Sequence, residues 1–217
     1  DDFIDKEYAD FTAEMWSKGH SFFCYLSDSP DSLASCCRLR NSITELDKID
    51  ESHNHTTHQY SMGTASVSTG SKSVMTINLN RLIQLATRRY FLERKGIVVD
   101  GSKALTRADY DKNQLYEYIR AAVTEETERV HKYQMAFNEI IKDFLAARML
   151  DVYQAGFIDM KRQYLTIGVN GLTDAAEFLG LTISPNPEYN EFVDVILETI
   201  NRSNKKDKTP DTMFNTE

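Results

Sequence analysis

The sequence is poor in cysteine, proline and glycine, with three, four and nine residues among 217. Three cysteines, two of them adjacent, cannot build the disulfide framework of a small secreted protein, and they fit a reducing compartment such as the cytoplasm. The chain also lacks any run of eighteen apolar residues and any charged-then-apolar N-terminal segment. It therefore predicts neither a membrane span nor a signal peptide.

Positive charge is scarce relative to negative charge, since 25 Lys and Arg face 33 Asp and Glu for a formal net charge of −8. This balance argues against a general surface for nucleic acid or anionic membrane, but it leaves room for a local phosphate pocket. An initiating methionine is missing too, and residues 209–217 read as a Pro-Asp turn followed by the start of a strand. We therefore expect a piece of a longer protein, long enough to bury a sizeable core.

The first third of the chain combines one helical pattern with long polar stretches. Residues 3–18 predict a helix that ends at Gly19, and the apolar residues 20–27 predict a buried strand. Residues 28–41 predict a loop, and residues 51–73 predict a second, unusually long one. Compact domains seldom keep a loop of that length unless it serves a site or is disordered.

Strand-to-helix units follow in the remainder of the chain. Residues 74–79 alternate as a strand and lead into a helix that Gly96 ends. Residues 163–181 repeat the pattern, with Gly168 and Gly171 at the turn. Such units predict an α/β fold. About four strands are visible, and their parallel arrangement requires partner strands that the chain does not supply.

Two further helices are predicted. Residues 106–150 carry a helical pattern, and a helix of 35 residues there would extend roughly 50 Å, a scaffold for a large domain. The apolar residues that mark this pattern most clearly are Phe137, Ile140, Ile141, Phe144 and Leu145. The second of these helices is predicted at residues 188–203 and is amphipathic. Residues 201–211 predict a charged linker after it.

The cysteines are the first candidates for chemistry. Cys24 lies in an apolar run, where a free cysteine behaves as a small buried hydrophobe. Cys36 and Cys37 lie in a polar stretch instead, and a disulfide between sequence neighbours strains the backbone, so the pair links nothing together. Arg38 favours a thiolate beside it. The residues by themselves leave a redox role and a nucleophilic role open.

Three other motifs carry weaker signals. His53, His55 and His58 are spaced as metal ligands, but no cysteine or carboxylate cluster completes a tetrahedral shell, so a solvated loop is the alternative. Residues 68–73, STGSKS, resemble a phosphate cradle or a plain polar turn, and their spacing is not that of a Walker A loop. In residues 166–172, TIGVNGL, the two glycines suit either an anion at a helix N-terminus or tight packing.

Four segments taken together resemble the anaerobic (class III) ribonucleoside-triphosphate reductases, which are glycyl radical enzymes. In the order in which that family shows them, they are LASCCRLRN, VSTGSKSVMTINLNRLIQ, RQYLTIGVNGLTDAAEFLG and MFNTE. The resemblance covers residues 8–217. It implies a segment of a ten-stranded α/β barrel made of two half-barrels, in which a finger loop (residues 28–41 here) carries a cysteine at its tip.

The resemblance also implies a reaction, the reduction of ribonucleoside triphosphates to the deoxyribonucleoside triphosphates that DNA replication requires. In this family a glycyl radical oxidises the finger-loop cysteine to a thiyl radical, which abstracts the 3′ hydrogen of the ribose, and the 2′-hydroxyl leaves as water. A radical-SAM iron–sulfur activase installs the glycyl radical. Formate or a thioredoxin-like redoxin supplies the electrons, and the full-length enzyme is expected to be a homodimer.

Carried over residue by residue, the family's Met-Gly-Cys-Arg tip falls on residues 35–38 and makes Cys37 the thiyl residue. Cys36 replaces the glycine, and Ser35 replaces the methionine associated with formate as reductant. This departure favours a redoxin and opens a redox role for Cys36. Ser71 falls near a family asparagine that contacts substrate. The expected substrate-binding residues are Ser35, Arg38, Ser68, Thr69, Gly70, Ser71 and Lys72.

By this resemblance the chain, residues 1–217, is the middle-to-late part of a catalytic barrel domain. The N-terminal nucleotide-sensing cone, the glycyl radical loop and the C-terminal zinc site are expected outside it, so the isolated segment is expected to be inactive. We expect a cytoplasmic protein that binds no nucleic acid and no membrane. Two alternatives stay open: a non-catalytic interaction module of the same fold, and a metal or thiol redox module built from the histidines and the cysteine pair.

Overall fold

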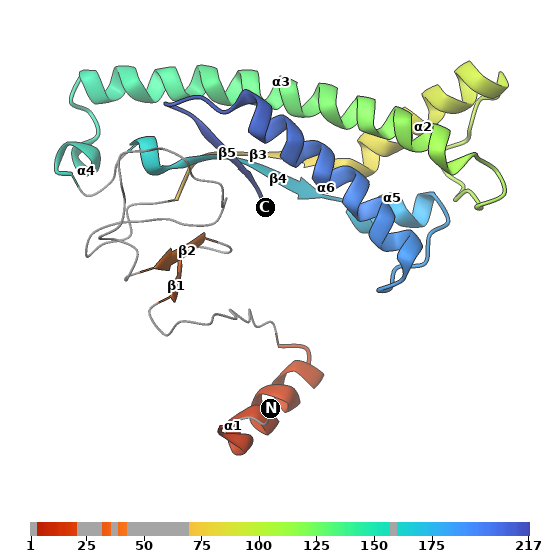
Figure 1. The fold of residues 1–217 in the computed structure, drawn as a ribbon, viewed down its shortest axis with the longest axis horizontal. Helices are drawn as coiled ribbons and strands as arrows, with labels where there is room; N and C mark the ends of the chain where they lie inside the picture. Colours follow the sequence, from red (N-terminus) through yellow and green to blue (C-terminus); the bar gives the residue numbers. More distant parts are fainter. Residues whose placement is uncertain (1–3, 21–31, 36–38, 43–69, 157–159) are drawn as a thin grey trace.

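The computed structural model describes residues 4–20, 32–35, 39–42, 70–156 and 160–217. Four helices and a small sheet make up most of the described chain, and the longest helix, α3, runs along one side of the molecule (Figure 1). The N-terminal helix α1 (Lys6–Ser17) lies apart from this body and buries none of its residues. Gly19 follows α1 with φ of +85°, so the predicted helix and its glycine end are confirmed.

The sheet has three parallel strands in the order β3 (Ser71–Asn78), β4 (Tyr164–Asn170) and β5 (Met213–Thr216). Side chains alternate between its two faces. Ile77 and Ile167 point into the hydrophobic core with the helices, whereas Val74, on the other face, is 54% exposed. We call this second face, which carries Val74 and Thr166, the open face. The predicted α/β class with parallel strands is thereby confirmed, while the ten-stranded barrel stays a prediction.

The helices that cover the other face begin and end where the sequence indicates. The side chain of Asn78 caps α2 (Leu79–Lys95) by accepting a hydrogen bond from the Arg81 N–H at 3.0 Å, and Gly96 ends it with φ of +66°. The predicted apolar stripe of α2 is buried at Leu79, Ile83, Ala86 and Tyr90. Two shorter elements, α4 (Asp151–Gln154) and a 3-10 helix (Met160–Arg162), precede β4.

Helix α3 (Lys112–Ala146) lies within the predicted range 106–150 and is shorter at both ends, and its apolar pattern is not all core. Phe137, Ile140 and Phe144 are 44–47% exposed, and of the marker residues only Ile141 is buried. The buried side chains in this half of α3 are mostly polar instead. They include Thr127, His131, Gln134 and Asn138. The periodicity predicted the helix correctly without identifying which side packs.

Three predictions of irregular structure are wrong in part. Within the predicted loop 28–41, β1 (Ser32–Ser35) and β2 (Leu39–Ser42) form an antiparallel hairpin. Polar residues can form such a ladder because the paired groups belong to the backbone. The predicted loop 51–73 yields residues 71–73 to β3. The predicted strand at residues 20–27 and the rest of the long loop lie outside the described residues.

The predicted charged linker at residues 201–211 is also mostly helix, because α6 (Pro187–Asp207) continues to Asp207. Contacts with α3 explain this extension. Asn204 is buried at 5% exposure, and Lys206 forms an ion pair with Glu128 at 2.6 Å. The charged composition therefore wrongly predicted a linker, because contacts with α3 stabilise a helix in this segment. The predicted terminal strand is confirmed as β5, and α5 (Leu172–Phe178) follows β4 as predicted.

Candidate functional site

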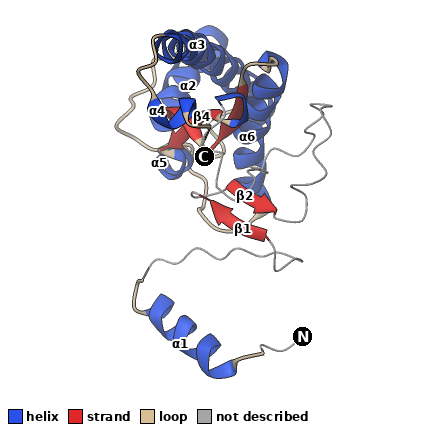
Figure 2. Ribbon diagram, turned by 90° about the vertical axis from the view of Figure 1, so that its left-hand side faces the viewer, coloured by secondary structure: helices blue, strands red, loops and turns tan. Residues whose placement is uncertain are grey.

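The residues proposed for radical chemistry fall between β1 and β2. Cys36, Cys37 and Arg38 lie outside the described residues, as does Cys24, while β1 ends at Ser35 and pairs in register with Leu39 of β2. Figures 1 and 2 both show this hairpin on the side of the sheet away from α3. The open face of the sheet and the strands flanking the cysteine pair are therefore on the same side of the molecule.

The predicted phosphate cradle is described only from Gly70 onward, because Ser68 and Thr69 lie outside the described residues. The Gly70 carbonyl accepts a hydrogen bond from the Tyr164 N–H at 2.8 Å, so the sheet pairing begins beside this residue. Ser71 and Lys72 are the first residues of β3. These three residues therefore lie at the N-terminal end of β3, where the pairing of the sheet begins, and they do not form a turn. We call this end of the sheet the amino edge.

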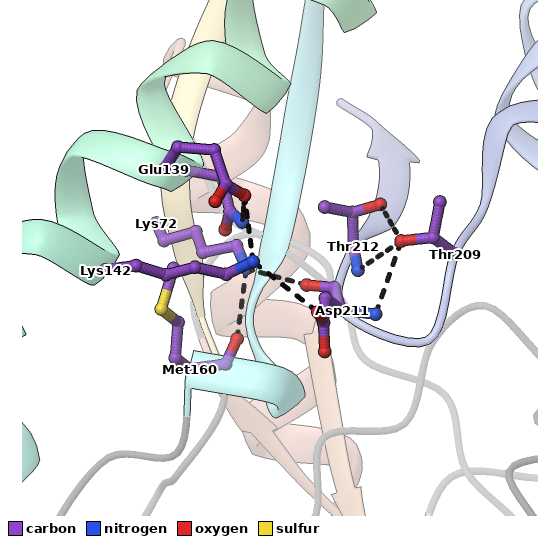
Figure 3. Close-up of polar contacts among 8 residues, drawn as sticks. Lys72, Glu139, Lys142, Met160, Thr209, Asp211 and Thr212 are labelled. Atoms are coloured by element: carbon purple, nitrogen blue, oxygen red, sulfur yellow. Dashed lines mark hydrogen bonds and ion pairs between the residues drawn. The ribbon is translucent and has the colours of Figure 1, made fainter.

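A cluster of polar contacts holds this amino edge (Figure 3). The Lys72 ammonium donates to the backbone carbonyls of Met160 at 3.1 Å and Asp211 at 3.4 Å. Lys142 of α3 forms ion pairs with Glu139 at 2.8 Å and with the Asp211 carboxylate at 3.5 Å. The hydrogen bond from Lys142 lowers the pKa of Glu139 and raises that of Lys142. Lys72 therefore ties β3 to the segments that lead into β4 and β5.

A row of three hydrogen-bonded side chains crosses the sheet. The Ser71 and Thr166 hydroxyls are bonded to each other, and the Thr166 hydroxyl donates to the Asn215 carbonyl oxygen at 2.6 Å. We call Ser71, Thr166 and Asn215 the open-face row, because Thr166 alternates with the core residue Ile167 along β4. Thr166 is fully buried and Asn215 is 8% exposed. Of the predicted substrate residues, Ser71 alone belongs to this row.

Sequence reasoning missed Thr166 and Asn215. The alternation in YLTIGVN was a usable signal, since it places Thr166 on the face opposite Leu165 and Ile167. The asparagine in MFNTE carried no comparable signal. Its pairing with Thr166 depends on the register between β4 and β5, which composition does not reveal.

A second buried polar cluster lies on the helix-covered face. Both ring nitrogens of His131 have partners, the Asp207 carboxylate at 2.8 Å and the Asn204 carbonyl oxygen at 2.9 Å. The ring stacks on Phe214 with 3.9 Å between centroids, and the Asn204 amide donates to the Thr216 hydroxyl at 3.0 Å. This cluster joins α3, α6 and β5 inside the molecule, so its role is structural.

The glycines of TIGVNGL are explained by packing. Gly168 lies within β4, which corrects its predicted place at the turn, and a Cβ there would stand 2.6 Å from the Thr76 hydroxyl oxygen. Gly171 does occupy the turn, with φ of +72°, and a Cβ there would lie 3.0 Å from that of Asn80. Of the two interpretations of this motif, the close approach of neighbouring chain is the one with a geometric basis.

The metal alternative gains no support from the part of the chain that the structure describes. Across the described ranges, no three His, Cys, Asp or Glu side chains gather closely enough to hold a metal ion. His53, His55 and His58 lie outside those ranges, so the proposed metal site there stays a prediction. Within the described residues, no helix has both the length and the apolar composition to cross a bilayer.

Comparisons with known proteins converge on one family. The family model described as anaerobic ribonucleoside-triphosphate reductase matches residues 1–217, whereas no curated protein matches the chain. A solved anaerobic ribonucleotide reductase is 26% identical, with a TM-score of 0.53 over 69% of this chain and 21% of that one.

Two structures of the Thermotoga maritima anaerobic ribonucleotide reductase overlap with more of the chain. The structure with glycerol in the active site is 27% identical, with a TM-score of 0.56 over 89% of this chain and 26% of that one. The complex with dATP and CTP is 26% identical, with a TM-score of 0.57 over 89% and 27%. The present chain thus spans about a quarter of the length of these relatives.

Proposed function

The chain belongs to the anaerobic ribonucleoside-triphosphate reductase family, and on that premise we propose that it is part of the catalytic barrel of an enzyme that reduces ribonucleoside triphosphates to deoxyribonucleoside triphosphates. The family match over all 217 residues carries this proposal. The structural similarity to the Thermotoga maritima enzyme and the position of the β1–β2 hairpin on the side of the sheet away from α3 support it. The nucleotide-sensing cone, glycyl radical loop and zinc site belong to other parts of the full-length enzyme.

Cys37 is the proposed hydrogen-abstracting residue. The glycyl radical, installed by a radical-SAM activase, supplies the oxidation of the Cys37 thiol to a thiyl radical. The Cys37 sulfur then takes the 3′ hydrogen of the ribose, which leaves a carbon radical at C3′ and a thiol at Cys37. Loss of the 2′-hydroxyl with a proton releases water. After two-electron reduction of the sugar, the Cys37 thiol returns its hydrogen atom to C3′ and becomes a thiyl radical again.

The reductant supplies the two electrons that replace the 2′ C–O bond by a C–H bond. Formate would leave as carbon dioxide, and a redoxin dithiol would leave as a disulfide. We propose a thioredoxin-like redoxin, because Ser35 stands where formate-using relatives have methionine and Cys36 offers a second thiol for disulfide exchange. We also propose a cytoplasmic homodimer, in keeping with the low cysteine content and the family.

The test is the Cys37→Ser variant of the full-length enzyme. Serine cannot form the sulfur radical, so we expect deoxynucleotide formation to fall below detection while the glycyl radical signal persists in electron paramagnetic resonance. Cys36→Ser is the matched control. It should keep activity with a small-molecule dithiol and lose most of its activity with a redoxin. Full activity of Cys37→Ser would overturn the proposed function.

A further inference from the structure

The open-face row has a defined hydrogen-bond direction. A hydroxyl carries a single proton. The Thr166 proton goes to the Asn215 carbonyl oxygen at 2.6 Å, so the bond between Ser71 and Thr166 must be donated by Ser71. The row therefore runs from Ser71 through Thr166 to Asn215, with the amide oxygen of Asn215 toward Thr166 and its amino group on the other side of the amide.

This direction leaves the Asn215 amino group available. Its two N–H donors have no hydrogen-bond partner among the described residues, although the residue is 8% exposed. The Asn215 nitrogen is not one of the fully buried side-chain atoms that lack a partner, so it is accessible at the surface of this nearly buried residue. An oriented amide donor that is accessible on the open face can bind a ligand that carries an acceptor oxygen.

Gln163, close to Gly70, is a second amide whose oxygen is already hydrogen-bonded. Its carbonyl oxygen accepts a hydrogen bond from the Tyr153 hydroxyl at 2.5 Å, and the residue is 7% exposed. Its amide nitrogen lies 3.9 Å from the position that a Cβ on Gly70 would take. Gly70 therefore lies next to the Gln163 amide, and Ser71 is linked through Thr166 to the Asn215 amide.

We propose that Asn215 is a substrate-binding residue whose amino group donates a hydrogen bond to an oxygen of the ribonucleoside triphosphate, and that Thr166 is the positioning residue that orients it. This inference rests on the proposed function. Phosphate and ribose oxygens are acceptors, which matches an amide N–H donor.

The test uses the full-length enzyme, one variant at Asn215 and a matched pair of variants at Thr166. Asn215→Asp keeps an acceptor for Thr166 and replaces the amino group by a carboxylate oxygen, so we expect CTP affinity to fall by about tenfold or more. Thr166→Val removes the orienting proton, whereas Thr166→Ser keeps it. We expect Thr166→Val to raise KM by about three- to tenfold with kcat little changed, and Thr166→Ser to restore the wild-type KM.

CTP binding is measured in the presence of dATP on the radical-free enzyme, so the result does not depend on Cys37. Wild-type CTP affinity in Asn215→Asp would overturn the binding role, even if Cys37→Ser confirms the reaction. Equal KM values for Thr166→Val and Thr166→Ser would overturn the positioning role. If Asn215→Asp fails to fold, Asn215→Ser removes the amide without adding charge and must show the same direction of change.

Discussion

Gly96 and Gly180 show how the same residue meets two different demands at the ends of helices. Both have a left-handed backbone, with φ of +66° and +72°. A Cβ on Gly96 would meet no atom within 4 Å, whereas a Cβ on Gly180 would overlap with the backbone carbonyl of Leu105. The sequence predicts Gly96 as a helix end, and only the structure adds Gly180 and distinguishes conformational freedom from close approach.

This difference predicts unequal costs for two equal substitutions. Gly96→Ala should lower the free energy of unfolding by about 1–2 kcal/mol, which is the cost of a left-handed L-residue. Gly180→Ala should cost more than that, because the Leu105 carbonyl must move away from the new Cβ. This movement also disturbs the hydrogen bond from the Leu105 N–H to the Phe178 carbonyl at the end of α5. Chemical denaturation of the two variants checks this order. Equal destabilisation would show that the contact at Gly180 relaxes freely.

At the scale of elements, a buried tyrosine, whose phenol can lose a proton, contributes to the packing of α3 on α6. Tyr116 of α3 is 2% exposed and packs against Phe192 of α6, with 6.4 Å between ring centroids. Burial disfavours the phenolate and raises the pKa of Tyr116 to about 12. The contact between these helices is therefore linked to pH in the alkaline range.

The sign of this linkage follows from the raised pKa. Below pH 10 the phenol is protonated in both the folded and unfolded states, so its full contribution to stability is present. Between about pH 10 and 12 the unfolded state loses the proton first, and stability should fall by about 2–3 kcal/mol. Tyr116→Phe should reduce this alkaline loss in denaturation curves. An unchanged pH dependence would contradict the assignment to Tyr116.

At the scale of the whole molecule, the described chain exposes apolar side chains on two surfaces. Tyr133, Phe137, Ile140 and Phe144 form an exposed apolar stripe along α3, and Val74 is exposed on the open face. The chain also spans about a quarter of the length of its solved relatives. We therefore attribute the catalytic activity to the full-length enzyme.

The isolated 217-residue segment should show no turnover. Supplied with CTP, dATP, reductant and a radical-SAM activase under anaerobic conditions, it should form no dCTP above background, while the full-length enzyme does under the same conditions. Product analysis by chromatography makes the comparison. Sustained dCTP formation by the segment would show that these residues contain the whole catalytic apparatus.

Local signals in the sequence determined most of the elements. The alternation in VMTIN, the Gly96 end and the helical pattern of residues 106–150 act over a few neighbouring residues, so the sequence displays them directly. Four sequence motifs, in the order that the family shows, also indicated the reductase family. The same local reasoning failed at residues 204–207, beyond the predicted helix end at residue 203, because the helix there depends on contacts with α3.

Tertiary structure decided which of these elements meet. Ser71 and Thr166 are 95 residues apart and Thr166 and Asn215 are 49 apart, yet strand register brings their side chains into one hydrogen-bonded row. Composition and periodicity report on one segment at a time and do not contain the register between distant strands. The sequence by itself therefore identified the reductase family and Cys37 as its proposed radical residue, while only the fold oriented the amide of Asn215.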